Sequence, residues 1–218
     1  MVKFGNKFSK DKLIRIAGKK ISSGDSSHDI NHTMRVLSAS IKIAKAEGAD
    51  LDIIVPAAIF HDVICYPKNH RKRLDSQTES AEFAKNILRK IGSFPIDKIK
   101  KVYDSINLCS FTKAQVPDFL EAKILQDADS LEAMGAISIM RTFSSAGVMN
   151  KSFYNPLDPF CDKRNPDDEK YALDLFFSRL LIVKNRLHTK TAKTMAKKRI
   201  AILEDFLKAL RFELSDII

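Results

Sequence analysis

Hydrophobic residues recur along most of the chain at intervals of three and four, the spacing that places side chains on one face of an α-helix. The chain has only seven glycines and seven prolines, fewer turn residues than hairpin-rich β folds usually need. We therefore expect an all-α fold. The helical pattern covers approximately residues 32–48, 51–64, 78–92, 97–109, 121–143, 172–187 and 191–218.

Local signals predict where several of these helices begin and end. Gly48 should terminate the first helix, and Asp50 should cap the N-terminus of the second. Ser80 or Thr78 should cap the third. Pro56 lies inside the second helical pattern and should mark a kink or a late start of that helix.

Two segments interrupt the helical pattern. Residues 66–77 are polar and basic, and residues from about 147 to 168 contain Pro156, Pro159 and Pro166 without helical or strand periodicity. A connection as long as the second is often functional or mobile.

The chain length of 218 residues suits one domain that can bury a sizeable core. We expect a single domain over residues 1–218, with a core at about 25–145 and a C-terminal helical part at about 170–218. Oligomeric state is not readable from the pattern, and a homodimer is one of the states that remain open.

Charge and cysteine content narrow the expected partners and compartment. The formal net charge of +10 favours anionic ligands such as phosphates, although many of the lysines could simply form a solvated surface. Cys65, Cys109 and Cys161 are odd in number and far apart, which fits a reducing compartment. With no apolar run long enough to span a bilayer and no secretory signal, we expect a cytoplasmic protein without a membrane partner.

The first candidates for a functional site are two histidines on apolar helical faces. His32 lies on such a face, and His61 is followed directly by Asp62 within an apolar run. Burying an imidazole beside a carboxylate is costly unless something pairs with both, and a divalent cation does so. A hydrogen-bonded core histidine is the alternative, and periodicity alone favours that alternative.

A third acidic position supports the same interpretation. Asp129 shares a predicted helical face with Leu125, Ala133 and Ala136, so its carboxylate should need a partner. Asp127 points about 160° away around the helix, so the two acids should not share one role. A buried ion pair at Asp129 is the alternative.

The ordered set HTMRV, FHDV and DADSLEA resembles the HD-domain superfamily of metal-dependent phosphohydrolases, and in particular bacterial HD proteins related to nucleotide pyrophosphohydrolases. The resemblance runs from about residue 25 to 213 and implies an all-α HD-domain bundle with additional C-terminal helices. It implies that the metal ligands are His32, His61, Asp62 and Asp129. Alignment alone would also admit Asp127.

The resemblance also implies substrate contacts and a reaction. It places His28 near the substrate side of the metal, and Lys68 and Arg73 where relatives carry basic residues that contact phosphate. The implied activity is hydrolysis of a phosphate ester or anhydride, with a nucleotide as substrate and Asp62 as the catalytic carboxylate that links the ion to the attacking water. The implied cofactor is a divalent ion, Mn²⁺ or Mg²⁺ in function, while Ni²⁺, Zn²⁺, Co²⁺ or Fe²⁺ could be bound after purification.

Three positions depart from the pattern of relatives. Cys109 and Leu175 stand where relatives often carry a histidine, and Cys65 stands where some HD nucleotidases carry a water-activating glutamate. These departures leave the four ligands in place but support an alternative function, a metal-retaining, non-catalytic protein that binds and senses a nucleotide. We do not expect a nucleic-acid partner, because no recognition helix and no alternation of aromatic and basic residues is present.

Overall fold

The structure is a computed structural model and describes residues 9–21, 29–66, 70–109 and 115–215. Over these ranges it contains helices and no β-strand, apart from one isolated bridge between Ser152 and Tyr171, so the all-α prediction is confirmed. In the same ranges, no helix has both the length and the apolar character needed to cross a membrane. The chain divides into two compact units, Met1–Asp129 (unit 1) and Ser130–Ile218 (unit 2). The single domain expected from the sequence stays a prediction.

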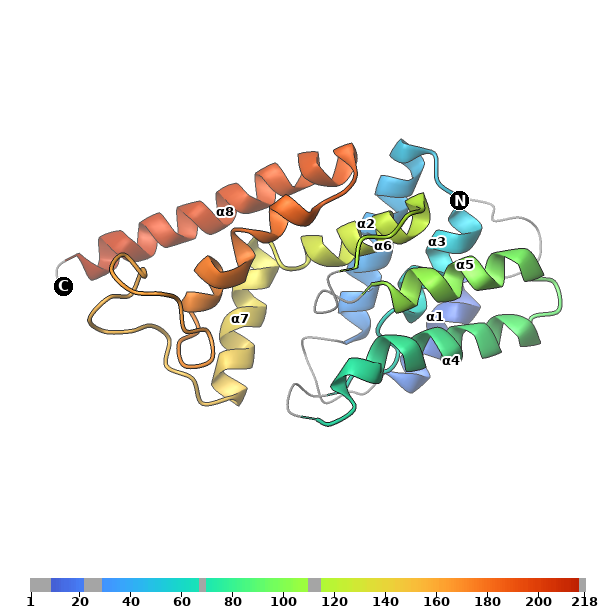
Figure 1. The fold of residues 1–218 in the computed structure, drawn as a ribbon, viewed down its shortest axis with the longest axis horizontal. Coiled ribbons are helices and arrows are strands. Elements are labelled where there is room, and N and C mark those ends of the chain that lie inside the picture. The colour runs from blue at the N-terminus through green and yellow to red at the C-terminus, as the bar shows by residue number, and fades with distance from the viewer. Residues whose placement is uncertain (1–8, 22–28, 67–69, 110–114, 216–218) are drawn as a thin grey trace. The chain divides into compact units, whose positions relative to one another are not determined.

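Unit 1 is built around one short apolar helix, α3, which contacts α1, α2, α4 and α5 (Figure 1). The helices of this unit are α1 (Lys10–Lys20), α2 (Ile30–Glu47), α3 (Leu51–Phe60), α4 (Ser76–Lys90), α5 (Ile96–Asn107) and α6 (Leu120–Leu131), which continues across the boundary, together with the 3₁₀ turn η1 (Arg73–Asp75).

Helix α3 is central because it has no polar face after its first turn. Every residue from 53 to 60 is buried, including Pro56. The helix begins at Leu51, before the proline, so the late start suggested by Pro56 is wrong. Asp50 caps the helix as predicted, since its carboxylate accepts a hydrogen bond from the backbone N–H of Asp52 at 2.9 Å.

Other helix ends agree only partly with the sequence predictions. Gly48 ends α2 in the left-handed conformation with φ of 77°, as its position predicted. The caps expected for α4 are wrong: the helix begins at Ser76, and Ser80 lies inside it. The Ser80 hydroxyl instead bonds the backbone of Ile64, which ties the segment after α3 to α4. Helix α1 was not predicted, although its Leu13 is fully buried.

The long helix expected at residues 121–143 is interrupted. Helix α6 ends at Leu131, and α7 (Ala136–Val148) begins after Gly135, whose φ of 79° favours glycine. A Cβ at Gly135 would lie 3.3 Å from Arg199 Cβ, a tight contact that would require a small shift of the neighbouring side chain. The guanidinium of Arg199 donates a hydrogen bond to the Leu131 carbonyl at the end of α6.

Unit 2 contains α7, the short π-helix η2 (Phe176–Leu180), the 3₁₀ turn η3 (Val183–Arg186) and α8 (Lys190–Leu214). Its core includes an aromatic cluster in which Phe143 of α7 meets Phe206 of α8 at 6.1 Å between ring centroids.

The α-helix predicted at residues 172–187 is wrong over most of its length, because this stretch forms the π-helix η2 and the 3₁₀ turn η3. The N–H of Leu181 bonds the carbonyl of Phe176, five residues earlier, which gives a wider turn than an α-helix.

The irregular segment between α7 and η2 is held by a buried carboxylate. Asp174 is fully buried and accepts hydrogen bonds from the Arg164 guanidinium and, at 2.6 Å, from the backbone N–H of Asp167. Arg164 also donates to the carbonyl of Asp158. Phe160 is buried, and the guanidinium of Arg211 lies over its ring. Side-chain contacts thus replace regular backbone pairing in this part of unit 2.

Candidate metal centre

The two histidines of the site are presented by the ends of two packed helices. His32 lies in the first turn of α2, where the Asp29 carboxylate caps the helix by accepting a hydrogen bond from the His32 N–H at 2.8 Å. His61 follows the last residue of α3. Both side chains are buried, each with 1% of its surface exposed.

The ring of His61 is oriented by the backbone of its own helix. Its Nδ1 lies 2.9 Å from the carbonyl oxygen of Ala58, which has no proton to donate. Nδ1 of the neutral ring therefore carries the hydrogen, and Nε2 presents a lone pair. This arrangement is common for metal-binding histidines, because it fixes both the tautomer and the direction of the ring.

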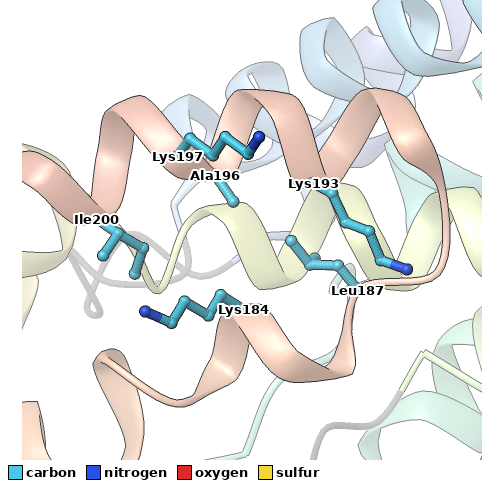
Figure 2. Close-up of a pocket in the computed structure, with 6 residues that line it drawn as sticks. All are labelled: Lys184, Leu187, Lys193, Ala196, Lys197 and Ile200. Carbon is cyan, nitrogen blue, oxygen red and sulfur yellow. The ribbon is translucent and has the colours of Figure 1, made fainter.

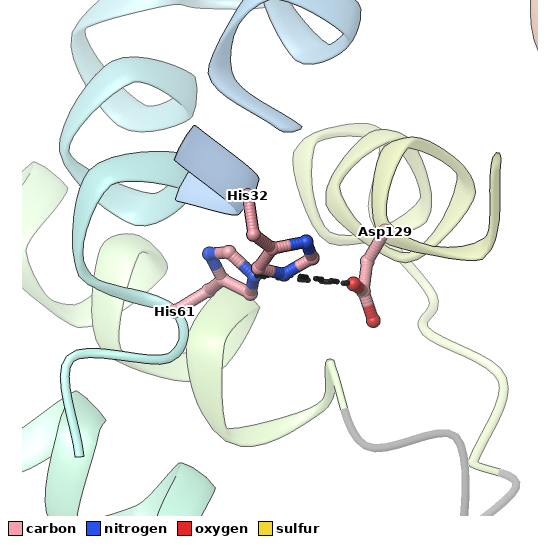
Figure 3. Close-up of side chains that lie close together, drawn as sticks. All are labelled: His32, His61 and Asp129. Atoms are coloured by element: carbon pink, nitrogen blue, oxygen red, sulfur yellow. Dashed lines mark hydrogen bonds and ion pairs between the residues drawn. The ribbon is translucent and has the colours of Figure 1, made fainter. Parts of the chain in front are cut away.

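Four polar atoms converge where the Nε2 atoms of the two rings meet. Nε2 of His32 lies 3.2 Å from Nε2 of His61, and Asp129 Oδ1 lies 3.6 Å and 3.9 Å from these two nitrogens (Figure 3). Asp62 Oδ2 lies 3.6 Å from His32 Nε2 and 3.7 Å from His61 Nε2. Of these, one atom each from His32, His61 and Asp129 form a set in which every pair lies within 4.8 Å.

These separations fit the dimensions of a divalent-cation site. With ligand bonds of about 2.1 Å, neighbouring ligand atoms are about 3.0 Å apart in an octahedron and about 3.4 Å apart in a tetrahedron. The distances between the two histidine nitrogens and the Asp129 oxygen run from 3.2 to 3.9 Å and bracket or slightly exceed these values. Two imidazole nitrogens and two carboxylate oxygens are a donor set that suits several first-row ions and magnesium.

The structure places Asp129, and not Asp127, beside the histidines. Asp129 keeps 29% of its side chain exposed, whereas Asp127 is buried with 1% exposed. Of these two acids, only Asp129 belongs to the set of close ligand atoms found among the described residues. The predicted helical face that included Ala133 and Ala136 is wrong, because both residues lie beyond the end of α6. Only the spacing from Leu125 to Asp129 remains from that argument.

One of the atypical cysteines lies close to the acids of the site. Cys109 is buried, and burial followed by the negative charges of Asp129 and Asp62 raises the pKa of its thiol. Cys65 is exposed after the end of α3. A neutral thiol thus lies near the two carboxylates.

Of the three residues predicted to contact the substrate, only Arg73 lies in the part of the chain that the structure describes. His28 and Lys68 lie outside the described residues. Arg73 opens the turn η1 and is exposed, and no described contact joins it to the cluster. The predicted basic loop contains a network that the sequence did not reveal: Glu79 of α4 accepts a hydrogen bond from the Tyr66 hydroxyl at 2.7 Å and pairs with Lys72 at 3.4 Å.

The helical architecture and this His/Asp cluster define a class of protein, and comparison with known families agrees. The HD domain family model matches residues 29–134, which include all four residues of the cluster. The chain belongs to the HD-domain superfamily.

Relatives with solved structures match almost the whole chain. The Lin1889 protein of Listeria innocua is 33% identical, with 95% of this chain and 98% of that chain covered and a TM-score of 0.70. An HD-superfamily hydrolase from Bacillus thuringiensis is 27% identical, with coverage of 94% and 96% and a TM-score of 0.73.

YpgQ of Bacillus subtilis is similar both in sequence and in structure. It is 29% identical over 198 residues, which are 90% of this chain and 89% of YpgQ. The crystal structure of YpgQ in complex with ADP is matched with a TM-score of 0.72, covering 94% of this chain and 98% of that chain.

Proposed function

We propose that this protein is a metal-dependent hydrolase that cleaves a phosphate ester or anhydride, with a nucleotide as its substrate. The observation that carries the proposal is the convergence of His32, His61 and Asp129, with Asp62 beside them. The complex of YpgQ with ADP supports a nucleotide as the ligand class.

The residues of the cluster supply a site for a divalent cation. Asp62 and Asp129 contribute two negative charges, and the two imidazoles contribute neutral nitrogen ligands. A cation held there lowers the pKa of a water molecule and polarises a phosphoryl oxygen. We propose Mn²⁺ or Mg²⁺ as the functional ion, while Ni²⁺, Zn²⁺, Co²⁺ or Fe²⁺ would also bind these ligands in a purified sample.

Asp62 is proposed as the catalytic carboxylate. It directly follows His61 and keeps 14% of its side chain exposed, so water and substrate can reach it. A carboxylate has two oxygens, and Asp62 can therefore both face the ion and accept a proton from the attacking water. Lys68 and Arg73 are proposed to bind the phosphate, because their positive charges would offset the negative charge that develops on it, and His28 is proposed to lie on the substrate side of the metal.

A hydrolysis screen of the full chain tests the proposal. Nucleoside tri-, di- and monophosphates, cyclic nucleotides and simple phosphodiesters are incubated with added Mn²⁺ or Mg²⁺, and phosphate or pyrophosphate release is measured. We expect turnover of at least one nucleotide, lost with EDTA and lowered about 10²- to 10⁴-fold in Asp62→Ala. Asp97→Ala removes an exposed acid in the first turn of α5 and should retain the wild-type rate.

Absence of turnover above that of Asp62→Ala, for every compound, would reject the hydrolase. The neutral Cys109 thiol beside the two acids favours a second function in that case, a metal-retaining protein that binds and senses a nucleotide without cleaving it. That alternative predicts metal-dependent binding of ADP with no product formed.

A further inference from the structure

Unit 2 contains a pocket that is separate in its residues from the metal cluster. It has a volume of about 340 Å³ and lies between α8 and the turn η3 that precedes it. This volume is at the lower end of the roughly 300–1,000 Å³ usual for small-molecule sites. The pocket is lined by Lys184, Leu187, Lys193, Ala196, Lys197 and Ile200 (Figure 2).

The pocket has an apolar floor and a cationic rim. Leu187, Ala196 and Ile200 are buried, with 4%, 2% and 5% of their surfaces exposed. Ala196 and Ile200 lie one helical turn apart and point from α8 toward the segment that carries Leu187 (Figure 2). The small side chain of Ala196 leaves room between the helix and that segment.

The lysines at the rim come from both sides of the pocket. Lys193 and Lys197 are one turn apart on α8, and Lys184 lies in η3. All three are exposed. Like charges at this spacing repel each other, and a bound anion would relieve that repulsion.

Among the described residues, no acidic side chain pairs with these three lysines. From residue 175 to residue 203 the sequence contains eight lysines and arginines and no aspartate or glutamate. Within the described part of the chain, no carboxylate lies within 4.0 Å of the ammonium groups of Lys184, Lys193 or Lys197. Arg199, on the same helix, is by contrast engaged with Glu132 and with the Leu131 carbonyl.

We propose that this pocket binds a small organic polyphosphate, with the phosphates at the three lysines and the less polar part of the molecule on the apolar floor. Lysine binds phosphate as a compact, flexible point charge, so three ammonium groups on mobile side chains can adjust to a chain of phosphates. The proposal goes beyond the proposed hydrolysis, because the pocket uses no residue of the metal cluster and needs no cation.

Binding without metal is the direct test. The full chain is titrated with ADP, inorganic tripolyphosphate and adenosine in EDTA, and heats of binding are measured by calorimetry. We expect saturable binding of ADP and tripolyphosphate and none of adenosine. The double variant Lys193→Ala/Lys197→Ala should bind both polyphosphates about 100-fold more weakly, about ten-fold for each lost charged contact.

A matched double variant distinguishes binding in the pocket from binding to a generally basic surface. Lys190→Ala/Lys198→Ala removes the same charge from the same helix, but neither residue lines the pocket. It should change the affinity by no more than about two-fold, in keeping with screened surface charges. Equal losses of polyphosphate affinity in the two double variants would overturn the proposed binding in the pocket. They would indicate binding to a diffuse cationic surface, as expected for a nucleic-acid binder. Absence of any binding in EDTA, or equal binding of adenosine, would also overturn it.

Steady-state kinetics distinguish two sources of the polyphosphate. A higher KM with unchanged kcat in Lys193→Ala/Lys197→Ala would identify the bound molecule as the substrate itself. An unchanged KM, together with lost binding in EDTA, would identify a separate effector. Only this kinetic measurement rests on the proposed hydrolysis, so failure of that function leaves the binding test intact.

Discussion

If the cluster holds a divalent ion as proposed, replacing Asp129 by Asn should remove most of the stabilisation that the ion gives, whereas replacing Asp127 by Asn should preserve it. Asp129 Oδ1 lies within 3.9 Å of both histidine nitrogens, so the substitution would remove a proposed charged ligand. Asp127 lies two residues away on the same helix, is buried, and is not one of the close ligand atoms found among the described residues. The two variants therefore make the same chemical change, aspartate to asparagine, at two different positions of one helix.

The expected size of the effect follows from mass action. An ion that binds only the folded protein at 100 times its Kd stabilises it by about 2.7 kcal/mol. For a unit of 129 residues, 1 kcal/mol changes the melting temperature by about 4 °C, so the wild type should gain about 10 °C. If loss of Asp129 weakens binding about 100-fold, about 0.4 kcal/mol remains, a rise of less than about 2 °C.

Thermal unfolding of both variants and the wild type, with EDTA and with a series of Mn²⁺ concentrations, measures these differences. Asp127→Asn should start from a lower melting temperature, because substitution of a buried, partnered carboxylate costs about 1–3 kcal/mol, and should then gain nearly the full 10 °C. A variant of Asp129 that keeps the full metal-dependent rise, while the Asp127 variant loses it, would refute the assignment of Asp129 as a ligand.

Two other predictions concern stability. Gly135→Ala should destabilise the protein by about 1–2 kcal/mol, because φ at Gly135 is 79° and the new Cβ would lie 3.3 Å from Arg199 Cβ. Gly92→Ala, which meets nothing within 4 Å, should change stability by less than about 0.5 kcal/mol in denaturant titrations, and equal effects would contradict the argument. Asp158→Asn should reduce the loss of stability in acid. The backbone N–H of Lys163 donates a hydrogen bond to the Asp158 carboxylate and lowers the pKa of that carboxyl group below its ordinary value of 3.8. The stability that Asp158 contributes is therefore present above pH 3.8 and is lost as the pH falls through the lower pKa of the folded state. Melting temperatures measured on both sides of pH 3.8 test this, and parallel curves for variant and wild type would speak against it.

Long helices with a regular apolar stripe were predictable from the sequence, and the break between α6 and α7 was not predicted. The residues on both sides of Gly135 are good helix formers, so local preferences continue across it. Gly135, with φ of 79°, is the local signal that could have located the break. The close approach of Arg199, a residue far along the chain, is not contained in any local pattern.

The segment before α8 shows a different limit of periodicity. Phe176, Leu180 and Val183 are buried at helical spacing, as the pattern indicated. Yet the backbone forms a π-helix and a 3₁₀ turn. Burial of the side chains fixes the direction in which they point, but it does not fix which backbone carbonyl each N–H group bonds. The pattern therefore located the core residues correctly and the type of helix incorrectly.

The candidate site was predictable to the extent that burial of polar groups is costly. His32 and His61 stood out as polar residues on apolar helices, and the structure brings their Nε2 atoms to 3.2 Å. Choosing between two acids on α6 needed geometry that spacing supplied only in part. The contacts of Glu79 with Tyr66 and Lys72 gave no sequence signal, because an acid in the first turn of an exposed helix is ordinary.

The end of α6 also limits where the protein can be cut into fragments, because the helix continues past the boundary between the two units. A fragment that ends at Asp129 would lose the N–H groups of residues 130 and 131, which close the last turn of α6 around that aspartate. It would also lose the Leu131 carbonyl, which accepts a hydrogen bond from Arg199, 68 positions downstream. A fragment meant to keep Asp129 on a complete helical turn therefore extends beyond unit 1, at least through Leu131.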